Sequence, residues 1–345
     1  MVQSELEPSR LAPPVAVIVL NWNGRENTLV CLDALTLVKY ENLAIIVVDN
    51  GSTDNSVPAF RAAYPRIEVI ETGSNLGYAG GNNVGIAHAI RRGAEYVLIL
   101  NNDTTVDPEA VGHAISVAQT YGDSVGVIGF ATYQQNAPEV LHNLGINAGT
   151  QGGFYVPSPR MLHESDALPI GSAHGCAMLL TRKLVETIGL FDEDFFLVHE
   201  EVDLCARARQ AGFAVLGATR ARVWHIGGVS FGGEDSPLRV FYHWRNWPLY
   251  VHKRLTETNE ANQWASYLKD YEVAVHDGAI QCLREHKPAH AFSLLAALRC
   301  ASVRRWGKKD LSLGLRLLIC GDLFKLYCTA ALRSVRRRLR PSRVK

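Results

Sequence analysis

The triplet Asn101-Asn102-Asp103 offers two amides and a carboxylate directly after residues 96–100, an apolar run with the length of a buried strand. In open α/β sheets, ligands bind beyond the carboxyl ends of the strands. An aspartate at such a position can bind a hard divalent cation, and the amides beside it can hydrogen-bond hydroxyl groups. The same residue types also favour an Asx turn, and the triplet on its own favours that turn over a binding site.

Three further candidate groups each have a structural alternative. Asp49 ends a second apolar run and would equally suit a turn. Glu201 lies in an acidic cluster with Glu200 and Asp203 that opens a predicted helix, where negative charge is favourable on electrostatic grounds alone. His225 ends a strand-like segment, where a lone histidine is commonly a core residue. The chemical interpretation therefore depends on whether the fold brings these side chains together.

The elements that must position these residues alternate along the first half of the chain. Helices are predicted between apolar strands at residues 15–20, 44–48, 67–70, 96–100 and 125–129. Such alternation is typical of a parallel sheet covered on both faces. Polar breaks at Asn21, Asp49 and Asn101 each follow a strand, so we expect them at the same edge of the sheet.

The second half of the chain is less regular. Residues 131–170 are predicted as loops and short strands, helices are expected at 182–188 and 203–211, and the pattern is helical from about residue 264. A glycine-rich loop at residues 73–83 does not match the dinucleotide fingerprint, and the chain has no Walker A motif. These absences argue against a dinucleotide-binding enzyme and a P-loop ATPase.

Charge divides the chain into an acidic body and a basic tail. Residues 284–345 contain 16 Lys and Arg against 3 Asp and Glu, which predicts contact with an anionic partner. The seven cysteines form no Cys-x-x-Cys motif, which indicates a reducing compartment without a disulfide framework or a zinc cage. We find no signal peptide and no membrane-spanning run, so we expect a cytoplasmic protein.

Six motifs in this order resemble those of the inverting family-2 glycosyltransferases, which have a GT-A fold: VIVLNWNG, VVDNGSTD, NLGYAGGNN, LNND, GLFDEDFF and HEEVDLCAR. The resemblance covers roughly residues 14–250 and looks greatest to the rhamnosyltransferase-like branch of bacterial cell-surface polysaccharide synthesis. It implies an α/β catalytic domain at residues 14–255, with a mostly parallel central sheet flanked by helices. A helical, basic C-terminal region at residues 256–345 follows.

The resemblance implies that one group of residues binds the nucleotide of a sugar donor. Asp49 matches the acid that hydrogen-bonds the pyrimidine base, and Asn102 matches the residue that contacts the ribose. The implied nucleotide-sugar-binding residues are Asn21, Trp22, Asp49, Asn75, Asn83 and Asn102.

The resemblance also implies metal-assisted catalysis. Asp103 matches the metal ligand at the end of an Asp-x-Asp-type motif, although amides occupy the first two positions here. His225 lies where some family members place a metal-binding histidine, so Mg²⁺ or Mn²⁺ is the expected cofactor. Glu201 matches the catalytic base, with Glu200 and Asp203 as competitors.

The implied donor is dTDP-rhamnose or a UDP-sugar, and the implied acceptor is a saccharide or a lipid-linked glycan. One base without a carboxylate nucleophile fits single displacement with inversion. A loop near residues 174–175 or 227–233 is expected to close over the donor and exclude water. The basic tail is expected to hold the enzyme on the anionic inner face of the cytoplasmic membrane.

Other functions stay open at this point. A sugar-phosphate nucleotidyltransferase shares the sheet type, but it needs a glycine-rich, basic signature after the first strand, which residues 21–25 lack. A catalytically inactive glycan-binding or scaffold protein is the second alternative. The basic tail would also suit a helical cap or a homo-oligomer contact, and no nucleic-acid-binding motif is present. The sugar, the acceptor, the linkage and the oligomeric state do not follow from the sequence.

Overall fold

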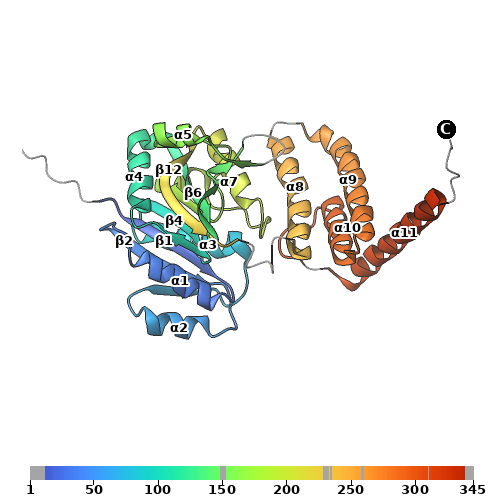
Figure 1. Cartoon of the computed structure of the whole chain (residues 1–345), viewed down its shortest axis with the longest axis horizontal. Helices are drawn as coiled ribbons and strands as arrows, with labels where there is room; N and C mark the ends of the chain where they lie inside the picture. Colours follow the sequence, from blue (N-terminus) through green and yellow to red (C-terminus); the bar gives the residue numbers. More distant parts are fainter. Residues whose placement is uncertain are drawn as a thin grey trace, which may run out of the picture. The chain divides into compact units, whose positions relative to one another are not determined.

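The computed structural model describes residues 12–147, 153–227, 233, 235–257, 260–309 and 311–338. The chain divides into two compact units (Figure 1). The sheet unit comprises Met1–Phe191 and Glu201–Ile226, and the helical unit comprises Asp192–Glu200 and Gly227–Lys345. The predicted combination of an α/β body and a helical C-terminal region is confirmed.

One large mixed sheet forms the centre of the sheet unit. Its strands lie in the order β10-β12-β6-β11-β4-β1-β2-β3, with β5 paired to β12 and β7 to β6. The strands β3, β2, β1 and β4 are parallel, β6 and β12 are parallel, and β11 runs antiparallel between β4 and β6. The bounds are β1 (Val15–Asn21), β2 (Leu43–Asp49), β3 (Glu68–Glu71), β4 (Tyr96–Asn101), β5 (Thr104–Val106), β6 (Val125–Gln134), β7 (Ala137–Asn143), β10 (Ala167–Pro169), β11 (Ala177–Thr181) and β12 (Ala214–His225).

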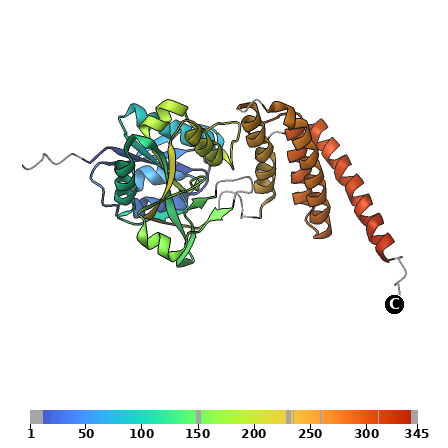
Figure 2. The same cartoon turned by 90° about the horizontal axis from the view of Figure 1, so that it is seen from above.

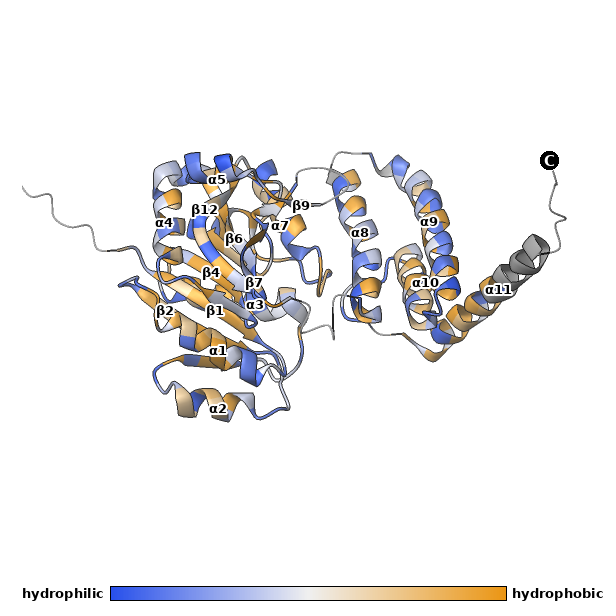
Figure 3. Cartoon of the chain, in the orientation of Figure 1, coloured by the Kyte–Doolittle hydropathy of each residue, from blue (hydrophilic) through white to orange (hydrophobic). Residues whose placement is uncertain are grey.

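Helices cover both faces of this sheet because its strands are apolar on both sides. On β1, Val17 and Val19 pack in one apolar cluster, and Ala16 and Ile18 pack in another. The first cluster contains residues of α1 (Arg25–Leu35), α2 (Ser56–Ala63) and α4 (Ala110–Tyr121). The second contains residues of α3 (Gly77–Arg91), α6 (Arg182–Ile188) and α7 (Glu200–Gln210). The apolar strands are visible between the helices in Figure 3.

The register of the parallel strands brings the predicted polar breaks to one edge. Asn21 is paired with Asp49 across β1 and β2, and Leu20 is paired with Asn101 across β1 and β4. The expectation of a common edge is therefore confirmed.

Several element bounds differ from the sequence prediction. The strand expected at residues 125–129 continues to Gln134 because β7 folds back and pairs with it. The helix predicted after the strand at residues 44–48 begins at Ser56, after Asn55 in a left-handed conformation. Residues 131–170 also contain β8 (Gly145–Ile146), β9 (Phe154–Tyr155) and α5 (Pro159–Glu164), and the 3-10 turn η1 (Gly122–Ser124) precedes β6.

Among the residues that the structure describes, the helical unit contains four long helices and the short 3-10 helix η3 (Ala261–Gln263). They are α8 (Pro237–Glu257), α9 (Trp264–Arg284), α10 (Pro288–Ser302) and α11 (Leu313–Arg338), shown from a second side in Figure 2. Most side chains of α10 are buried in one apolar cluster with residues of the other three helices. The pattern did not predict α8, which contains Pro248. This helix belongs to the helical unit, although the sequence analysis assigned most of it to residues 14–255.

Residues 192–200 belong to the helical unit and adopt a strained backbone. Phe196, Val198 and His199 have positive φ angles, which are costly for residues other than glycine. Arg245 and Asn246 of α8 hold this segment by donating to its carbonyl oxygens, including that of Phe195 over 2.8 and 2.9 Å.

Among the described residues, no helix is both long and apolar enough to cross a membrane.

Candidate active site

Asn21 and Asp49 end adjacent strands and form the centre of a buried polar network. Nδ2 of Asn21 donates to Oδ2 of Asp49 over 2.8 Å and to Oγ of Ser52 over 3.0 Å. The main-chain N–H of Ser52 donates to the other carboxylate oxygen of Asp49 over 2.9 Å. These bonds fix the orientation of the Asp49 carboxylate at the edge of the sheet.

Asn102 extends this network from the end of β4. Its Nδ2 donates to Oγ1 of Thr28 over 2.9 Å, and Thr28 donates to Oδ1 of Asn21 over 2.8 Å. Gly24 lies against the same amide, since a Cβ added there would lie 2.4 Å from Nδ2 of Asn102. The sequence analysis missed Thr28 because it lies within α1 and belongs to none of the motifs that marked the other site residues.

The other three predicted nucleotide residues lie in different environments. Trp22 is 40% exposed. Oδ1 of Asn75 accepts from the main-chain N–H of Gly77 over 2.8 Å, which shapes the glycine-rich loop before α3. Asn83 is buried, and its amide exchanges hydrogen bonds of 2.9 and 3.0 Å with the main chain of Phe191. These contacts of Asn83 tie α3 to the segment after α6.

Asp103 and His225 are brought together by the antiparallel pairing of β5 with β12. His225 is paired with Thr104, the residue after Asp103, and Nε2 of His225 lies 3.1 Å from Oδ1 of Asp103. This Nε2 atom is buried and has no hydrogen-bond partner in the part of the chain that the structure describes. A buried carboxylate beside an imidazole nitrogen without a hydrogen bond fits a divalent cation as the missing partner.

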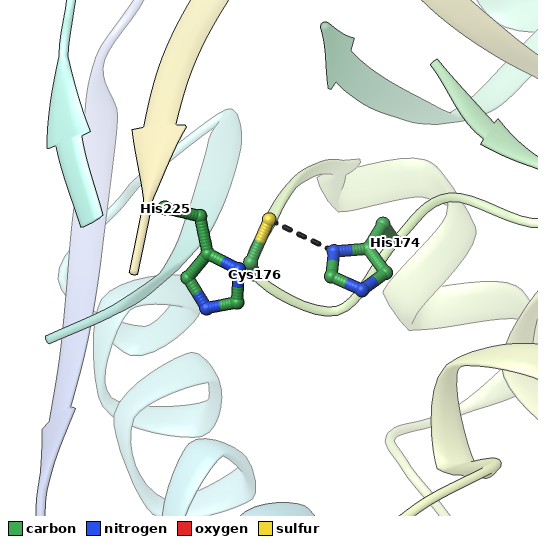
Figure 4. A group of neighbouring side chains, drawn as sticks. All are labelled: His174, Cys176 and His225. Carbon is green, nitrogen blue, oxygen red and sulfur yellow. Dashed lines mark hydrogen bonds between the residues drawn. The ribbon is translucent and has the colours of Figure 1, made fainter. Parts of the chain in front are cut away.

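His174 and Cys176 lie beside His225. The sequence analysis expected the loop near residues 174–175 to close over the donor, but it did not predict His174 as a metal ligand and did not place Cys176 in the site. The carbonyl of Cys176, just before β11, accepts from the main-chain N–H of Asn101 over 2.9 Å. One possible ligand atom from each of His174, Cys176 and His225 lies within 4.8 Å of the others (Figure 4). Their sequence spacing carries no metal-binding signal, and only the fold brings them together.

Glu201 lies in the first turn of α7, close to the loop that precedes Cys176. A Cβ added to Gly175 would lie 3.9 Å from the carboxyl carbon of Glu201. The main-chain oxygen of Glu201 accepts from Oγ of Ser172 over 3.2 Å, which anchors the helix start to this loop. Glu201 is half-buried. It lies at the same end of the sheet unit as Cys176, because its carboxyl group is close to Gly175.

Asp203 has a different environment from Glu201. Its buried carboxylate accepts from Nε of Arg207 over 2.8 Å. The guanidinium of Arg207 also donates to the carbonyl oxygens of Ile188 and Leu190. Asp203 therefore belongs to an ion pair that joins α7 to the segment after α6.

Charge and burial together perturb the Cys176 thiol. Burial raises its pKa to about 12, and the negative charges of Asp103 and Glu201 act in the same direction, while a hydrogen bond with Thr132 opposes them. Both carboxylates are thus near enough to influence one sulfur atom.

Of the two loops predicted to close over a donor, residues 174–175 are described, whereas residues 228–232 lie outside the described residues.

A family model matches the chain, and so do curated relatives, among them two named glycosyltransferases. The family model, described as glycosyl transferase family 2, matches residues 16–189. The low-salt glycan biosynthesis hexosyltransferase Agl10 of Haloferax volcanii is 26% identical over 241 residues, which cover 67% of this chain and 73% of the relative. The N-acetylglucosaminyl-diphospho-decaprenol L-rhamnosyltransferase of Mycobacterium tuberculosis is 25% identical over 236 residues, which cover 61% of this chain and 76% of the relative.

Two solved structures share the fold. The mannosyltransferase PcManGT of Pyrobaculum calidifontis, in complex with GDP-Man and Mn²⁺, has a TM-score of 0.54 at 16% identity, covering 87% of this chain and 92% of that one. GalNAc-T7, with UDP, GalNAc and Mn²⁺, has a TM-score of 0.57 at 13% identity, covering 70% of this chain and 48% of that one. At these identities the likeness concerns the fold alone, and it confirms the predicted GT-A architecture.

Proposed function

The chain belongs to glycosyl transferase family 2, and on this premise we propose that it transfers a hexose from a nucleoside-diphosphate donor to a saccharide or lipid-linked acceptor. The observation that carries the proposal is the meeting of the Asp49 network, the Asp103–His225 pair and Glu201 in one unit. Rhamnose from dTDP-rhamnose is our first choice of donor, and a UDP-sugar is the second. One relative named as an L-rhamnosyltransferase supports that order.

The nucleotide is assigned to the network at the ends of β1, β2 and β4. The Asp49 carboxylate would accept from the ring N–H of a pyrimidine base, and Trp22 would line the base pocket with its exposed ring. Asn102 would contact the ribose, supported by Asn21 behind it. Bonds already made within the network hold these groups in place before the donor arrives, which reduces the entropic cost of binding.

Asp103 and His225 are assigned to a divalent cation, Mg²⁺ or Mn²⁺. The carboxylate oxygen suits either ion, and the imidazole nitrogen favours Mn²⁺. When bound, the cation would neutralise the charge that develops on the leaving diphosphate. Mn²⁺ in the two solved neighbours supports this assignment.

Glu201 is assigned as the base that takes a proton from the acceptor hydroxyl. Its competitor Asp203 is held in the ion pair with Arg207, and this supports Glu201 as the reacting carboxylate. Attack by the acceptor on the face opposite the diphosphate would invert the anomeric configuration in one step. Residues 174–175, next to Glu201, would help to exclude water from the anomeric carbon.

The acceptor is proposed to be reached at an anionic membrane surface, with the protein peripheral on the cytoplasmic side. Leu313, Leu317 and Phe324 of α11 are all more than 60% exposed and follow the spacing of one helical face. An open cavity of about 500 Å³ is lined by Leu283, His286, Pro288, Cys320, Leu323 and Phe324. Apolar side chains on a helix from the basic tail suit insertion among anionic lipid headgroups.

The two rival functions make different predictions. A sugar-phosphate nucleotidyltransferase would release inorganic diphosphate from a nucleoside triphosphate and a sugar phosphate. An inactive glycan-binding protein would bind saccharides without turning over any donor. The Asp103–His225 pair and the position of Glu201 favour the transferase.

The direct test is a turnover assay with dTDP-rhamnose and a panel of UDP- and GDP-sugars, supplied with Mn²⁺ and a polyprenyl-diphosphate saccharide. Release of nucleoside diphosphate together with a glycosylated acceptor supports the proposal. Nuclear magnetic resonance of the new linkage should reveal the anomeric configuration opposite to that of the donor. Retention of configuration would contradict single displacement, and turnover of nucleoside triphosphates instead would favour the nucleotidyltransferase.

A further inference from the structure

The donor set around Cys176 contains a sulfur atom, which the expected metal ions do not require. Nδ1 of His174 lies 2.9 Å from Sγ of Cys176, and the rings of His174 and His225 are 5.7 Å apart between centroids. With the Asp103 oxygen beside His225, the cluster offers sulfur, two imidazole rings and a carboxylate. Mg²⁺ and Mn²⁺ prefer oxygen ligands, whereas a mixed set of thiolate and imidazole suits Zn²⁺.

We propose that His174, Cys176 and His225 form a binding site for a thiophilic divalent cation, Zn²⁺, and that the carboxylate of Asp103, which contacts His225 but lies outside this group, moves to become the fourth ligand. Donors around a tetrahedral zinc lie roughly 3.5 Å apart. The ligand atoms all lie within 4.8 Å of one another and need only small shifts, and Nδ1 of His174 and Sγ of Cys176, now 2.9 Å apart, would separate slightly. One thiolate and one carboxylate would balance the charge of the ion.

The surroundings of the cluster suit a bound cation. Cys176 is buried, so its sulfur is shielded from bulk water, and Oγ1 of Thr132 lies 3.4 Å away, where the hydroxyl could donate to a thiolate. Phe154 contacts the His174 ring edge-on, with centroids 5.4 Å apart, and covers it from outside. The buried Nε2 of His225 makes no hydrogen bond among the described residues, although it lies 3.1 Å from Asp103, and a cation would fill this place.

Zn²⁺ at this site would compete with the proposed Mg²⁺ or Mn²⁺ because both positions use Asp103 and His225. This consequence rests on the proposed function, whereas binding of Zn²⁺ itself does not. Occupancy by Zn²⁺ would block the cation site used for transfer, so the cluster would make the enzyme sensitive to zinc.

The test uses Co²⁺ as a spectroscopic substitute for Zn²⁺ on the full-length, chelator-treated protein. A cobalt–thiolate bond gives a charge-transfer band in the near ultraviolet. The wild type and Cys300→Ala should show this band, because Cys300 is a buried cysteine of the helical unit, in α10. Cys176→Ser should lack it, and its affinity for Zn²⁺ should fall by at least about 100-fold. Absence of the band in the wild type, or its persistence in Cys176→Ser, would overturn the site.

A second measurement separates this inference from the proposed function. Zn²⁺ titrated into the manganese-loaded wild type should release Mn²⁺, which electron paramagnetic resonance detects as the free ion, and no sugar donor is needed for this readout. Mn²⁺ that stays bound at saturating Zn²⁺ would contradict the shared ligands. Should the band appear while no nucleotide sugar is turned over, the metal site would stand and the transferase assignment would fail.

Discussion

Glu201 and Asp203 are two residues apart on α7, yet their surroundings support different roles. The Asp203 carboxylate is buried and bonded to Arg207, which also holds two carbonyl oxygens of the segment after α6. Loss of its charge would leave Arg207 without its ion-pair partner and should weaken the fold. Glu201 is half-buried next to Gly175, where an acceptor hydroxyl could approach it.

Glu201→Gln should reduce the transfer rate by about 10² to 10⁴-fold, because the amide cannot accept the acceptor proton. Donor affinity should stay close to that of the wild type, since Glu201 is not part of the nucleotide network. Single-turnover kinetics and calorimetric titration of the donor measure the two quantities separately.

Glu186→Gln is the matched control for this change. Glu186 lies on α6 in an exposed ion pair with Arg182, and its replacement should leave the transfer rate unaltered. Weak donor binding by Glu201→Gln with normal chemistry on bound donor would exclude Glu201 as the base.

At the scale of elements, the site depends on three strand ends that differ in direction. β4 leads into Asn102, β12 ends at His225, and β11 begins just after Cys176. The antiparallel pairing of β11 with β4 and of β5 with β12 brings these positions together. In a purely parallel sheet only the carboxyl ends of strands would lie at this edge. The antiparallel strand β11 brings its amino end there as well, and with it Cys176.

Gly24→Ala should weaken nucleotide binding because the added Cβ would lie 2.4 Å from Nδ2 of Asn102. Moving this amide would disturb its bond to Thr28 and cost about 1–3 kcal/mol, as overpacking typically does. Affinity for a nucleoside diphosphate, measured by calorimetry, should fall about tenfold or more, since 1.4 kcal/mol is one factor of ten.

Gly112→Ala provides the comparison for that experiment. Gly112 lies in α4, where an added Cβ would meet no atom within 4 Å. This variant should bind nucleotide normally and be slightly more stable, by roughly 0.5–1 kcal/mol. Equal losses of affinity in both variants would show that the contact with Asn102 is not responsible.

The sequence analysis located the parallel strands and their common polar edge because apolar runs and polar breaks are local signals. Asn21, Asp49 and Asn101 could thus be placed together before any coordinates were considered. Helix α8 was missed because Pro248 argues locally against a helix, while packing in the helical unit supports one. Thr28 and Cys176 were missed because their roles depend on contacts between distant strands and helices.

At the scale of the whole molecule, the sheet unit and the helical unit differ in charge and in the roles we assign to them. The sheet unit contains every residue assigned to donor, metal and base. The helical unit contains the basic tail and a strained segment at residues 196–199, in which His199 is half-buried with its Nε2 atom buried. The helical unit can therefore be tested by experiments that do not involve the proposed active site.

The helical unit should lose stability on acidification because of His199. Burial, together with the charges of His243 and Arg239, lowers its pKa from the ordinary 6.5 to about 3. Below pH 6.5 the unfolded chain binds a proton that the folded chain does not, so stability falls as the pH falls towards 3. At pH 5 the loss attributable to His199 should be about 2 kcal/mol.

His199→Asn should reduce this pH dependence, as measured by urea unfolding at pH 7 and pH 5. Asparagine tolerates the positive φ of this position better than most residues. His286→Asn is the matched control, because His286 also has a positive φ but is exposed. An unaltered pH dependence in His199→Asn would show that another group is responsible.

Membrane contact through α11 should depend on its exposed apolar face. The double variant Leu317→Asp/Phe324→Asp should bind anionic vesicles at least about tenfold more weakly, since burying one such side chain contributes about 1.5–3 kcal/mol. Val273→Asp, on an exposed position of α9, should bind as the wild type does. Sedimentation with vesicles at low and high salt measures both effects, and equal binding by all three proteins would contradict the proposed surface.

The central claim is that this chain binds a pyrimidine nucleoside diphosphate together with a divalent cation. Thermal unfolding with thymidine, uridine or guanosine diphosphate, each with and without Mn²⁺, tests it most directly. A pyrimidine nucleotide at 100 times its Kd should add about 2.7 kcal/mol of stability. This gain should be largest with Mn²⁺. In Asp103→Ala, the stability that the nucleotide adds should no longer depend on Mn²⁺. No stabilisation by any of these nucleotides, with or without metal, would contradict the account.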